Sequence, residues 1–419
     1  MRILFITPYV PSPIRFRSYN LLRQLSARHD VVALALCQGS REPDDLLALR
    51  SICPAVGVSL SRAEAALNCL RAVPSRVPLQ GAYCRSPELE SLVRAALTDP
   101  TRQPRAIPPE LLGPFDVVHV EHLRAGYVSS FIQPEMPMVY DSVDCISLLL
   151  ARTLRASLSP RQRLLAMLEI GRVRSYEGKL LRRFDRTAVT SPSDAAALRA
   201  LAPDASITVV PIGVDLEYFS PSPRQPEPET LVLSGKMSYH ANATAALHFV
   251  RNILPRIRAV RPGVRLTIAG SDPGREVRNL ARDPAITVTG HVPDIREALA
   301  RATVAICPVT VKVGIQSKAL EAMAMGRSVV CTREGLEGLQ AKAGRDLLMG
   351  ETAAEFAEHV CQLLDDPALR DRVGQAGRRY VETHHRWETV ASHLANLYQE
   401  TIDIKSQALG QIRAADHRR

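Results

Sequence analysis

Residues Thr303–Thr332 read TVAICPVTVKVGIQSKALEAMAMGRSVVCT, which is an apolar run, a loop, a helical pattern, a glycine and a second apolar run. A short apolar run bounded by turn signals is typical of a buried strand, and apolar residues three to four positions apart are typical of a helix that covers it. Two parallel strands joined by a crossover helix are the unit from which α/β sheets are built. The segment therefore predicts an α/β fold.

The same alternation recurs on both sides of this segment. Early in the chain, strands are predicted at Arg2–Thr7, Val31–Cys37, Asp116–Val120, Met138–Asp141, Thr187–Thr190 and Ile207–Val210, with a helix over Phe16–His29. Later strands are predicted in LVLSGKM, VRLTIAG, AITVTG, TVAICPV, SVVCT and DLLMG, with helices over Ala243–Val260, Arg275–Arg282, Ile295–Arg301 and Ser317–Met325. Strands with crossovers of this length form parallel sheets. Residues 40–110 have a weaker pattern, and Pro100–Pro109 is expected to be a loop.

A proline-rich segment separates the two series. Residues 221–229, PSPRQPEPE, have the composition of an extended linker and mark the neighbourhood of a domain boundary. We expect two doubly wound Rossmann-like domains, residues 1–215 and 228–385, that face a central cleft. A helix over residues 386–402 is expected to cross back to the first domain, and residues 403–419 to form a flexible tail.

Composition narrows the functional classes. The chain has 419 residues, of which 46% are hydrophobic, so two or three domains with buried cores are possible. The formal net charge of +10 favours phosphates or a membrane surface as partners, although an arginine-rich proteome explains it equally well. Net charge alone, without a recognisable nucleic-acid-binding module, does not predict a nucleic-acid partner.

Cysteine usage and hydropathy bear on location. The eight cysteines lie far apart without a CxxC pair, as in reduced, core-filling thiols of a cytosolic protein. The opening MRILFITPYV is too short for a secretory signal, and no stretch has the roughly 18 apolar residues that span a bilayer. We expect a cytoplasmic protein with at most peripheral contact to the inner face of the plasma membrane. The basic segment Leu158–Phe184 can make that contact, or it can be a helix that covers a domain.

The loop inside the opening segment has the features of an anion site. It ends in Gly314, so the backbone N–H groups of Ile315 and Gln316 can point at an anion at the helix N-terminus, where the helix dipole favours negative charge. Lys318 adds a formal positive charge, and Glu321 lies on nearly the same helix face, where it can accept hydrogen bonds from sugar hydroxyls. This spacing fits a nucleoside diphosphate, although an ordinary capped helix has it too.

Ligands of open α/β sheets bind beyond the carboxyl ends of the strands, and other polar residues follow predicted strands. Lys236 follows LVLSG and can reach a phosphate across the cleft, while Asn242 is predicted to be the N-cap of the next helix. Arg15 and Arg17 are expected in the loop after the first strand, where guanidinium groups suit a phosphate or an acidic acceptor. A solvated surface explains the two arginines equally well.

Two further strand ends carry histidine and aspartate. In FDVVHVEHLRAG, His122 lies at the carboxyl end of a strand and can contact a reacting sugar, whereas His119 is expected in the core. Because side chains alternate along a strand, His119 and Glu121 point away from His122, so no metal site is expected. Asp141 and Asp144 follow the next strand and can bind acceptor hydroxyls, or form a turn and an N-cap.

Taken together, these segments resemble the family 4 retaining glycosyltransferases of the two-domain GT-B architecture, and they look closest to the sugar transferases of bacterial exopolysaccharide systems. The matching pieces run in order from Met1 to about Tyr398. They are MRILFITPYVPSP, FDVVHVEH, TSPSDAAAL, VVPIGVDLEYFSP, LSGKMSYHANATAALHF, VRLTIAG, ITVTGHVPDI and SKALEAMAMGRSVV.

The resemblance implies that the C-terminal domain holds a nucleotide-sugar donor. Lys236 and Lys318 would contact the diphosphate and Glu321 the ribose, with the loop Gly314–Gln316 near the sugar. A catalytic histidine near the anomeric carbon is best matched by His122. No cofactor is implied, because the UDP-, GDP- or other nucleoside diphosphate sugar is the substrate.

The sequence departs from the family pattern at two places. Family members often carry two acidic residues with seven positions between them, ending at the helix glutamate, and here the first position is Val313. The glycine-rich loop after the first strand is replaced by a proline-containing segment. A nucleotide-sugar 2-epimerase on the same architecture and a catalytically degenerate nucleotide-sugar-binding protein are the alternatives. An NAD-dependent dehydrogenase is disfavoured because GxGxxG is absent.

The expected activity is metal-independent glycosyl transfer with retention to a glycan or lipid-linked acceptor, in cell-surface or exopolysaccharide biosynthesis. In such enzymes the acceptor hydroxyl attacks the face that the nucleotide leaves, and the departing diphosphate acts as the base. Lysines and a helix N-terminus can stabilise the leaving-group charge without a divalent ion.

Overall fold

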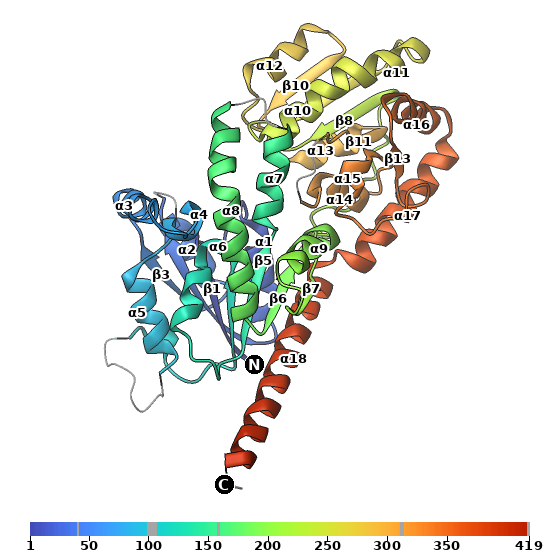
Figure 1. The fold of residues 1–419 in the computed structure, drawn as a ribbon. Helices are drawn as coiled ribbons and strands as arrows, with labels where there is room; N and C mark the ends of the chain where they lie inside the picture. The colour runs from blue at the N-terminus through green and yellow to red at the C-terminus, as the bar shows by residue number, and fades with distance from the viewer. Residues whose placement is uncertain (40–41, 99–106, 157–159, 311–313, 417–419) are drawn as a thin grey trace. The chain divides into compact units, whose positions relative to one another are not determined.

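A computed structural model describes residues 1–39, 42–98, 107–156, 160–310 and 314–416. The chain forms two compact units: unit 1 comprises Met1–Pro211 and Val390–Arg419, and unit 2 comprises Ile212–Thr389. Each unit contains one parallel sheet with its helices (Figure 1). The division at Pro211 lies ahead of the proline-rich segment 221–229, which belongs to unit 2.

The sheet of unit 1 has seven strands in the order β3-β2-β1-β4-β5-β6-β7, all parallel. The strands are β1 Arg2–Thr7, β2 Asp30–Cys37, β3 Ala55–Ser59, β4 Val117–Glu121, β5 Met138–Val143, β6 Arg186–Val189 and β7 Ile207–Val209. Strands β2 and β3 are added on one side of β1, and strands β4 to β7 follow one another on its other side. The order of strands therefore reverses between β1 and β4, and the carboxyl ends of these two strands flank the topological switch point, where open sheets bind ligands.

Helices connect these strands. They are α1 Phe16–Ser26, α2 Glu42–Arg50, α3 Arg62–Ala72, α4 Leu79–Tyr83, α5 Pro87–Ala96, η2 Pro109–Leu111, α6 His122–Ala125, η3 Gly126–Phe131, α7 Ile146–Ala156, α8 Pro160–Arg183 and α9 Pro192–Leu201. Local capping fixes several starts: Ser61 and Glu64 form a capping box at α3, and Ser86 and Ser191 cap α5 and α9. Helices α7 and α8 lie side by side (Figure 1).

The sheet of unit 2 has six parallel strands in the order β10-β9-β8-β11-β12-β13, with its switch point between β8 and β11. The strands are β8 Thr230–Ser234, β9 Arg265–Ala269, β10 Ile286–Gly290, β11 Val304–Cys307, β12 Val329–Thr332 and β13 Leu348–Gly350. The helices are α10 His240–His248, a π-helical turn η4 Phe249–Ile253, α11 Leu254–Val260, α12 Arg275–Arg278, η5 Asn279–Arg282, α13 Ile295–Arg301, α14 Ser317–Ala324, α15 Arg333–Leu336, α16 Ala353–Asp365 and α17 Pro367–His384.

The last helix, α18 Trp387–Asp416, begins in unit 2, and its residues from Val390 onward belong to unit 1. Within unit 1, the fully buried Tyr398 hydrogen-bonds through its hydroxyl to Nδ1 of His119 at 2.8 Å, and the His119 ring stacks on Phe5 at 3.9 Å between centroids. These contacts bury α18 against the sheet of unit 1. They also confirm that His119 is a core residue.

The α/β class and each predicted strand are confirmed, with shifts of up to three residues at the ends. Strand β3 was not predicted, nor were several helices, among them α2, α3, α5, α7, α9 and α16. The single helix expected over Ala243–Val260 is interrupted by the π-helical turn η4. The segment predicted to be a flexible tail from residue 403 is helical as far as Asp416. The loop expected at Pro100–Pro109 lies mostly outside the described residues.

Candidate functional site

The switch point of unit 2 brings together the loop after β8 and the N-terminus of α14. Lys318, in the first turn of α14, donates from Nζ to Oδ1 of Asn242 at 2.6 Å and to Oε1 of Gln316 at 3.0 Å. An ammonium group has three donors, and both partners are neutral amides. Lys318 is therefore held in place with one donor left for a ligand, and neither partner neutralises its charge.

Asn242 fixes the geometry on the β8 side. Its Nδ2 donates to the carbonyl of Lys236 at 3.0 Å, while its Oδ1 accepts from Lys318. The prediction that Asn242 is an N-cap is wrong, because Tyr239 occupies that position and Asn242 lies inside α10. The side chain spans from the β8 loop to α14 and cannot also serve the end of its own helix.

Two glycines make this approach possible. Gly235 has φ +136°, and a Cβ there would lie 2.8 Å from Nδ2 of Asn242 and 3.3 Å from Cε of Lys318. Gly270 has φ +153°, and a Cβ there would lie 1.9 Å from the carbonyl oxygen of Gly235. Positive φ and close backbone approach both require glycine. The sequence signal, a glycine directly after a strand, was present in VRLTIAG, but its role was missed.

The remaining predicted donor residues lie at the same edge of the sheet. Gly314 has φ +54°, Ile315 is buried, and Gln316 is the N-cap of α14. Glu321 is one turn beyond Lys318, and burial raises its pKa while the positive charge of Lys318 opposes that rise. Position 313, where the family acid is missing, lies outside the described residues.

The Lys236 side chain follows β8 and is exposed. No carboxylate in the described part of unit 2 forms an ion pair with Lys236 or Lys318. The edge therefore combines two lysines with the N–H groups of a helix start, which have no intrahelical acceptors. This arrangement suits a polyanion such as a diphosphate.

The switch point of unit 1 contains a buried polar cluster. Arg17 donates from Nη2 to Oδ2 of Asp141 at 2.8 Å and from Nη1 to the carbonyl of Pro211 at 3.0 Å. Its side chain is only 8% exposed, and that of Asp141 is 0% exposed. The prediction that Arg17 lies in a loop is wrong, since it lies in the first turn of α1. It is engaged by Asp141, at the carboxyl end of β5.

Glu121 lies beside this pair and was considered in the sequence only as a metal ligand. Its Oε1 accepts from the hydroxyls of Tyr9 at 2.5 Å and Ser18 at 2.7 Å, and Oε2 is buried with no partner among the described residues. Burial, followed by the negative charge of Asp141, raises the pKa of Glu121 to about 7. Tyr9 and Ser18 were missed, since they lie more than 100 residues from Glu121 in sequence.

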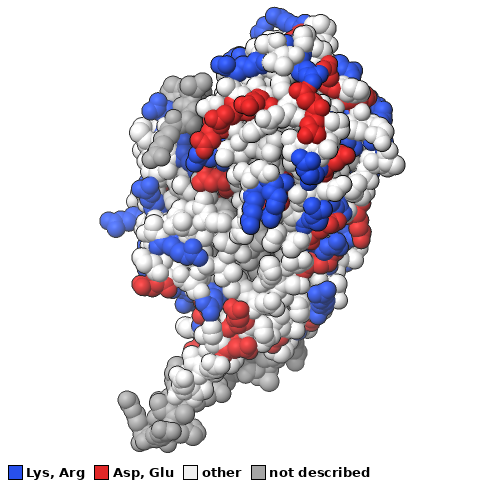
Figure 2. Space-filling model, turned by 90° about the vertical axis from the view of Figure 1, so that its right-hand side faces the viewer, with Lys and Arg blue, Asp and Glu red and all other residues white. Residues whose placement is uncertain are grey.

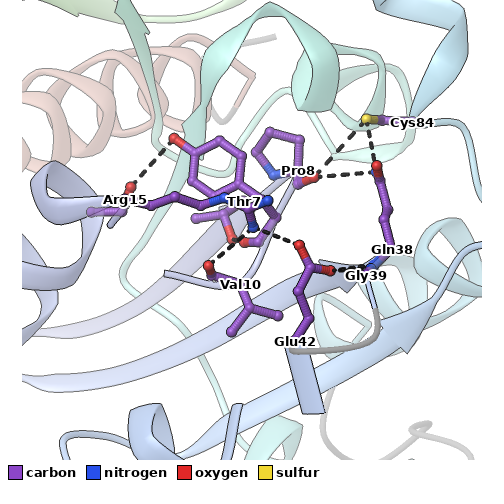
Figure 3. A network of polar contacts seen from close by, with 10 residues as sticks. Thr7, Pro8, Val10, Arg15, Gln38, Gly39, Glu42 and Cys84 are labelled. Atoms are coloured by element: carbon purple, nitrogen blue, oxygen red, sulfur yellow. Dashed lines mark hydrogen bonds and ion pairs between the residues drawn. The ribbon is translucent and has the colours of Figure 1, made fainter. Parts of the chain in front are cut away.

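Arg15, the N-cap of α1, stabilises the loop after β1. It forms an ion pair with Glu42 at 2.7 Å and donates to the carbonyl of Val10 at 3.2 Å (Figure 3). Its guanidinium group also lies over the ring of Tyr9, 4.6 Å from the centroid. The same carboxylate accepts from the backbone N–H groups after β2. Because Glu42 already neutralises Arg15, this residue is better suited to hold the loop than to bind a phosphate.

His122 directly follows β4, as predicted, and has the unusual φ of +65°. Its Nδ1 accepts from the N–H of Arg124 at 3.2 Å, and burial, followed by the charge of Arg124, lowers its pKa to about 3. The imidazole is therefore neutral at physiological pH. Backbone strain of this kind clusters at functional sites, which gives His122 a feature beyond its place in the sequence.

Asp144 does not cap α7. The N–H of Cys145 donates to Asp194 at 3.1 Å, and the N–H of Ile146 donates to Glu177 at 2.7 Å. Asp144 is instead half-buried, and burial, followed by the charge of Asp194, raises the pKa of its carboxyl to about 6. Among the described residues, no three His, Cys, Asp or Glu side chains come together as a metal site.

Comparison with known proteins places this geometry in context. Residues 228–366, which contain the Lys318 site, match the family described as "Glycosyl transferases group 1". Sucrose-phosphate synthase from Thermosynechococcus elongatus superposes with a TM-score of 0.68 over 96% of this chain and 100% of that one, at 18% identity. The fold is GT-B. HepE of Anabaena in complex with UDP gives a TM-score of 0.65 over 96% of this chain and 100% of that one, at 15% identity.

Curated relatives match part of the chain. Glycogen synthase of Mycobacterium tuberculosis is 32% identical over 215 residues, which cover 46% of this chain and 48% of that one. A GDP-mannose-dependent monoacylated alpha-(1-6)-phosphatidylinositol monomannoside mannosyltransferase of Corynebacterium glutamicum is 28% identical over 216 residues, covering 45% and 55%. The chain thus spans about half the length of these relatives. In the part of this GT-B chain that the structure describes, no helix is long and apolar enough to cross a membrane.

Proposed function

We propose that this GT-B protein transfers a sugar from a nucleoside diphosphate sugar to a glycan or lipid-linked acceptor. The observation that carries the proposal is Lys318, held by Asn242 and Gln316 at the N-terminus of α14, within the segment that matches the group 1 glycosyltransferases. In this assignment Lys318 and Lys236 bind the diphosphate, together with the loop Gly314–Gln316. Glu321 accepts hydrogen bonds from the ribose.

The proposed chemistry is transfer with retention. The bond between the anomeric carbon and the diphosphate oxygen breaks, the acceptor oxygen bonds to the same face of that carbon, and the acceptor proton passes to the departing diphosphate. Negative charge develops on the diphosphate, where two lysines and the helix dipole stabilise it. These groups supply the charge that a divalent ion would otherwise supply, so we propose that transfer needs no metal.

On the acceptor side we propose roles for His122 and Asp144. A neutral imidazole at His122 can donate or accept a hydrogen bond at the reacting sugar, and the half-buried carboxyl of Asp144 can bind an acceptor hydroxyl. Asp141 and Arg17 satisfy one another, so we assign them to holding this edge of the sheet in shape.

We also propose cytoplasmic action at a membrane surface, in the biosynthesis of cell-surface or exopolysaccharide glycans. The support is an exposed apolar stripe on α8, formed by Leu164, Leu165, Met167 and Leu168, next to exposed Arg163. Apolar and basic side chains together favour an anionic membrane interface. The Corynebacterium relative is named for a phosphatidylinositol-linked acceptor, which is consistent with a lipid-linked one here.

A transfer assay with purified protein tests the function. UDP- and GDP-sugars are screened for binding by calorimetry, and the sugars that bind are incubated with lipid and glycan acceptors in excess chelator. Glu321→Ala is expected to abolish donor binding, and Glu358→Gln, on the exposed face of α16, is the control. Release of free nucleotide without any acceptor would instead indicate epimerase chemistry. Tight donor binding without turnover on any acceptor would indicate a binding protein.

A further inference from the structure

A second polar pocket of about 780 Å³ lies in unit 2, at the opposite edge of the sheet from Lys318. Thr303 and Ser328, at its floor, directly precede β11 and β12, and Met325 and Gly326 follow the C-terminus of α14. Helix α14 has eight residues, so its two ends are roughly 12 Å apart. The pocket is therefore separate from the proposed donor site.

The lining of this pocket is strongly basic. It contains the five arginines Arg224, Arg327, Arg370, Arg378 and Arg379, and one acidic residue, Asp371. The face seen in Figure 2 shows basic (blue) and acidic (red) side chains interspersed. Within the pocket lining, basic side chains therefore outnumber acidic ones by five to one.

Three of the five guanidinium groups have partners within the described structure: Nη1 of Arg370 donates to the carbonyl of Leu363 at 3.0 Å. Arg378 forms an ion pair with Glu382 at 2.7 Å and donates to two backbone carbonyls, and Arg224 lies 3.8 Å from Glu227. Across the described residues, Arg327, Arg370 and Arg379 form no ion pair. No ion pair in the described structure therefore neutralises these three guanidinium groups, and their positive charge favours an anion from solution.

The floor of the pocket holds buried polar atoms that lack partners. Oγ of Ser328 and Nε of Arg327 are inaccessible and make no hydrogen bond within the described structure, and Ser328 as a whole is 1% exposed. Buried polar groups in native proteins are normally hydrogen-bonded, so each unpaired one calls for an unseen partner. Burial, and next the charge of Arg370, lower the pKa of Arg327, and a bound anion would oppose both effects.

Helix dipoles at this edge partly cancel. The C-terminus of α14 disfavours an anion, whereas the N-terminus of α17, which begins at Pro367 in the pocket wall, favours one. The side chains of Arg370 and Arg379 project from the same helix, α17. The electrostatic potential in the pocket is therefore positive, because it is set by the formal charges of the arginines.

We propose that this pocket binds a phosphorylated small molecule, with the phosphoryl group on Arg327 and Ser328 and the rest of the molecule between Arg370 and Arg379. Guanidinium forks and a hydroxyl match the oxygens of a phosphoryl group. The volume exceeds that of one phosphate and admits an ester or a diphosphate. A lipid headgroup shares this chemistry, but a bilayer surface meets the rim and not the buried floor atoms, so a solute is the better occupant.

Calorimetric titration of the full chain with inorganic pyrophosphate at constant ionic strength tests this proposal. The wild type is expected to show two sites, one lost in Lys318→Ala and the other weakened about tenfold or more in Arg327→Gln. Ser328→Ala, a milder change, should weaken the same site. The control is Arg372→Gln, which changes an exposed arginine of α17 outside the pocket lining.

The outcomes separate the two proposals. If Lys318→Ala removes all pyrophosphate binding, or if folded Arg327→Gln and Ser328→Ala leave the isotherm unchanged, the pocket proposal is overturned. If pyrophosphate does not bind but phosphatidylglycerol vesicles do, and Arg370→Gln with Arg379→Gln releases them, a membrane is the occupant and the solute proposal fails. If the wild type binds pyrophosphate only at the arginine-rich pocket and Lys318→Ala changes nothing, the donor assignment fails while the pocket proposal is supported.

Discussion

Replacing Lys318 by methionine isolates the contribution of its charge to the proposed donor site. Methionine keeps an unbranched stem and removes the ammonium group that donates to Asn242 and Gln316. A hydrogen bond to a charged group contributes about 1.5–3 kcal/mol, so one lost contact to the diphosphate should weaken UDP or GDP binding roughly 10- to 150-fold. The change also leaves the Asn242 oxygen without its donor, which should cost about 1–3 kcal/mol of stability.

Calorimetry with UDP and GDP measures the first effect, and urea unfolding measures the second. Lys342→Met, which removes an exposed lysine elsewhere in unit 2, is the control and should change neither. Binding is compared well below the unfolding midpoint of each variant, so that lost affinity is not confused with lost fold. Unchanged nucleotide affinity in folded Lys318→Met would refute the assignment of the diphosphate to this edge of unit 2.

Three further predictions concern the residues that shape the two switch points. Gly235→Ala should destabilise unit 2 by about 1–3 kcal/mol in urea unfolding, because φ at Gly235 is +136° and the space for a Cβ is filled by Asn242. Gly274→Ala is the control, since nothing lies within 4 Å of a Cβ at that position. Equal unfolding midpoints for the two variants would contradict the prediction. Burial raises the pKa of Glu121 in the folded protein to about 7, so the contribution of this group to the free energy of unfolding is lost as pH rises from about 4.5 to 7. Glu121→Gln should therefore reduce the fall in unfolding free energy over that pH range. Parallel plots of unfolding free energy against pH for the wild type and the variant would refute this. Tyr398→Phe should cost about 1–2 kcal/mol by removing the partner of His119, and an unchanged midpoint would show that this bond contributes nothing.

Most of the fold was predictable because the apolar runs are long and bounded by turn residues. Strand β3 was not predicted because its apolar segment, AVGVS, is short and contains Gly57. The structure explains that glycine: a Cβ there would lie 2.5 Å from Cδ2 of Leu46 in α2. A packing requirement between a strand and a helix looks like a turn signal when only the sequence is read.

The positions of the site residues were easier to predict than their partners. A polar residue directly after a buried strand must lie at the carboxyl edge of the sheet, and Lys236 and His122 do so; Lys318 lies there because it is in the first turn of the helix that follows β11. Partners are set by contacts between distant segments, such as the pair Lys318 and Asn242, 76 residues apart. The N-cap predictions for Asn242 and Asp144 failed for this reason, since local capping competes with tertiary hydrogen bonds.

The two units differ in whether an acid neutralises the basic residue that follows a strand. In unit 1, Asp141 pairs with Arg17 and Glu42 pairs with Arg15, so both arginines are occupied in maintaining the sheet edge. In the described part of unit 2, Lys318 is held by neutral amides and its charge remains available. The sequence shows each basic residue, but it does not show which carboxylate, more than 20 residues away, folds against it. A carboxylate in direct ion-pair contact therefore distinguishes a structural cation from one that can bind an anion, and its absence at Lys318 in the described part of unit 2 supports our proposal that a diphosphate binds there.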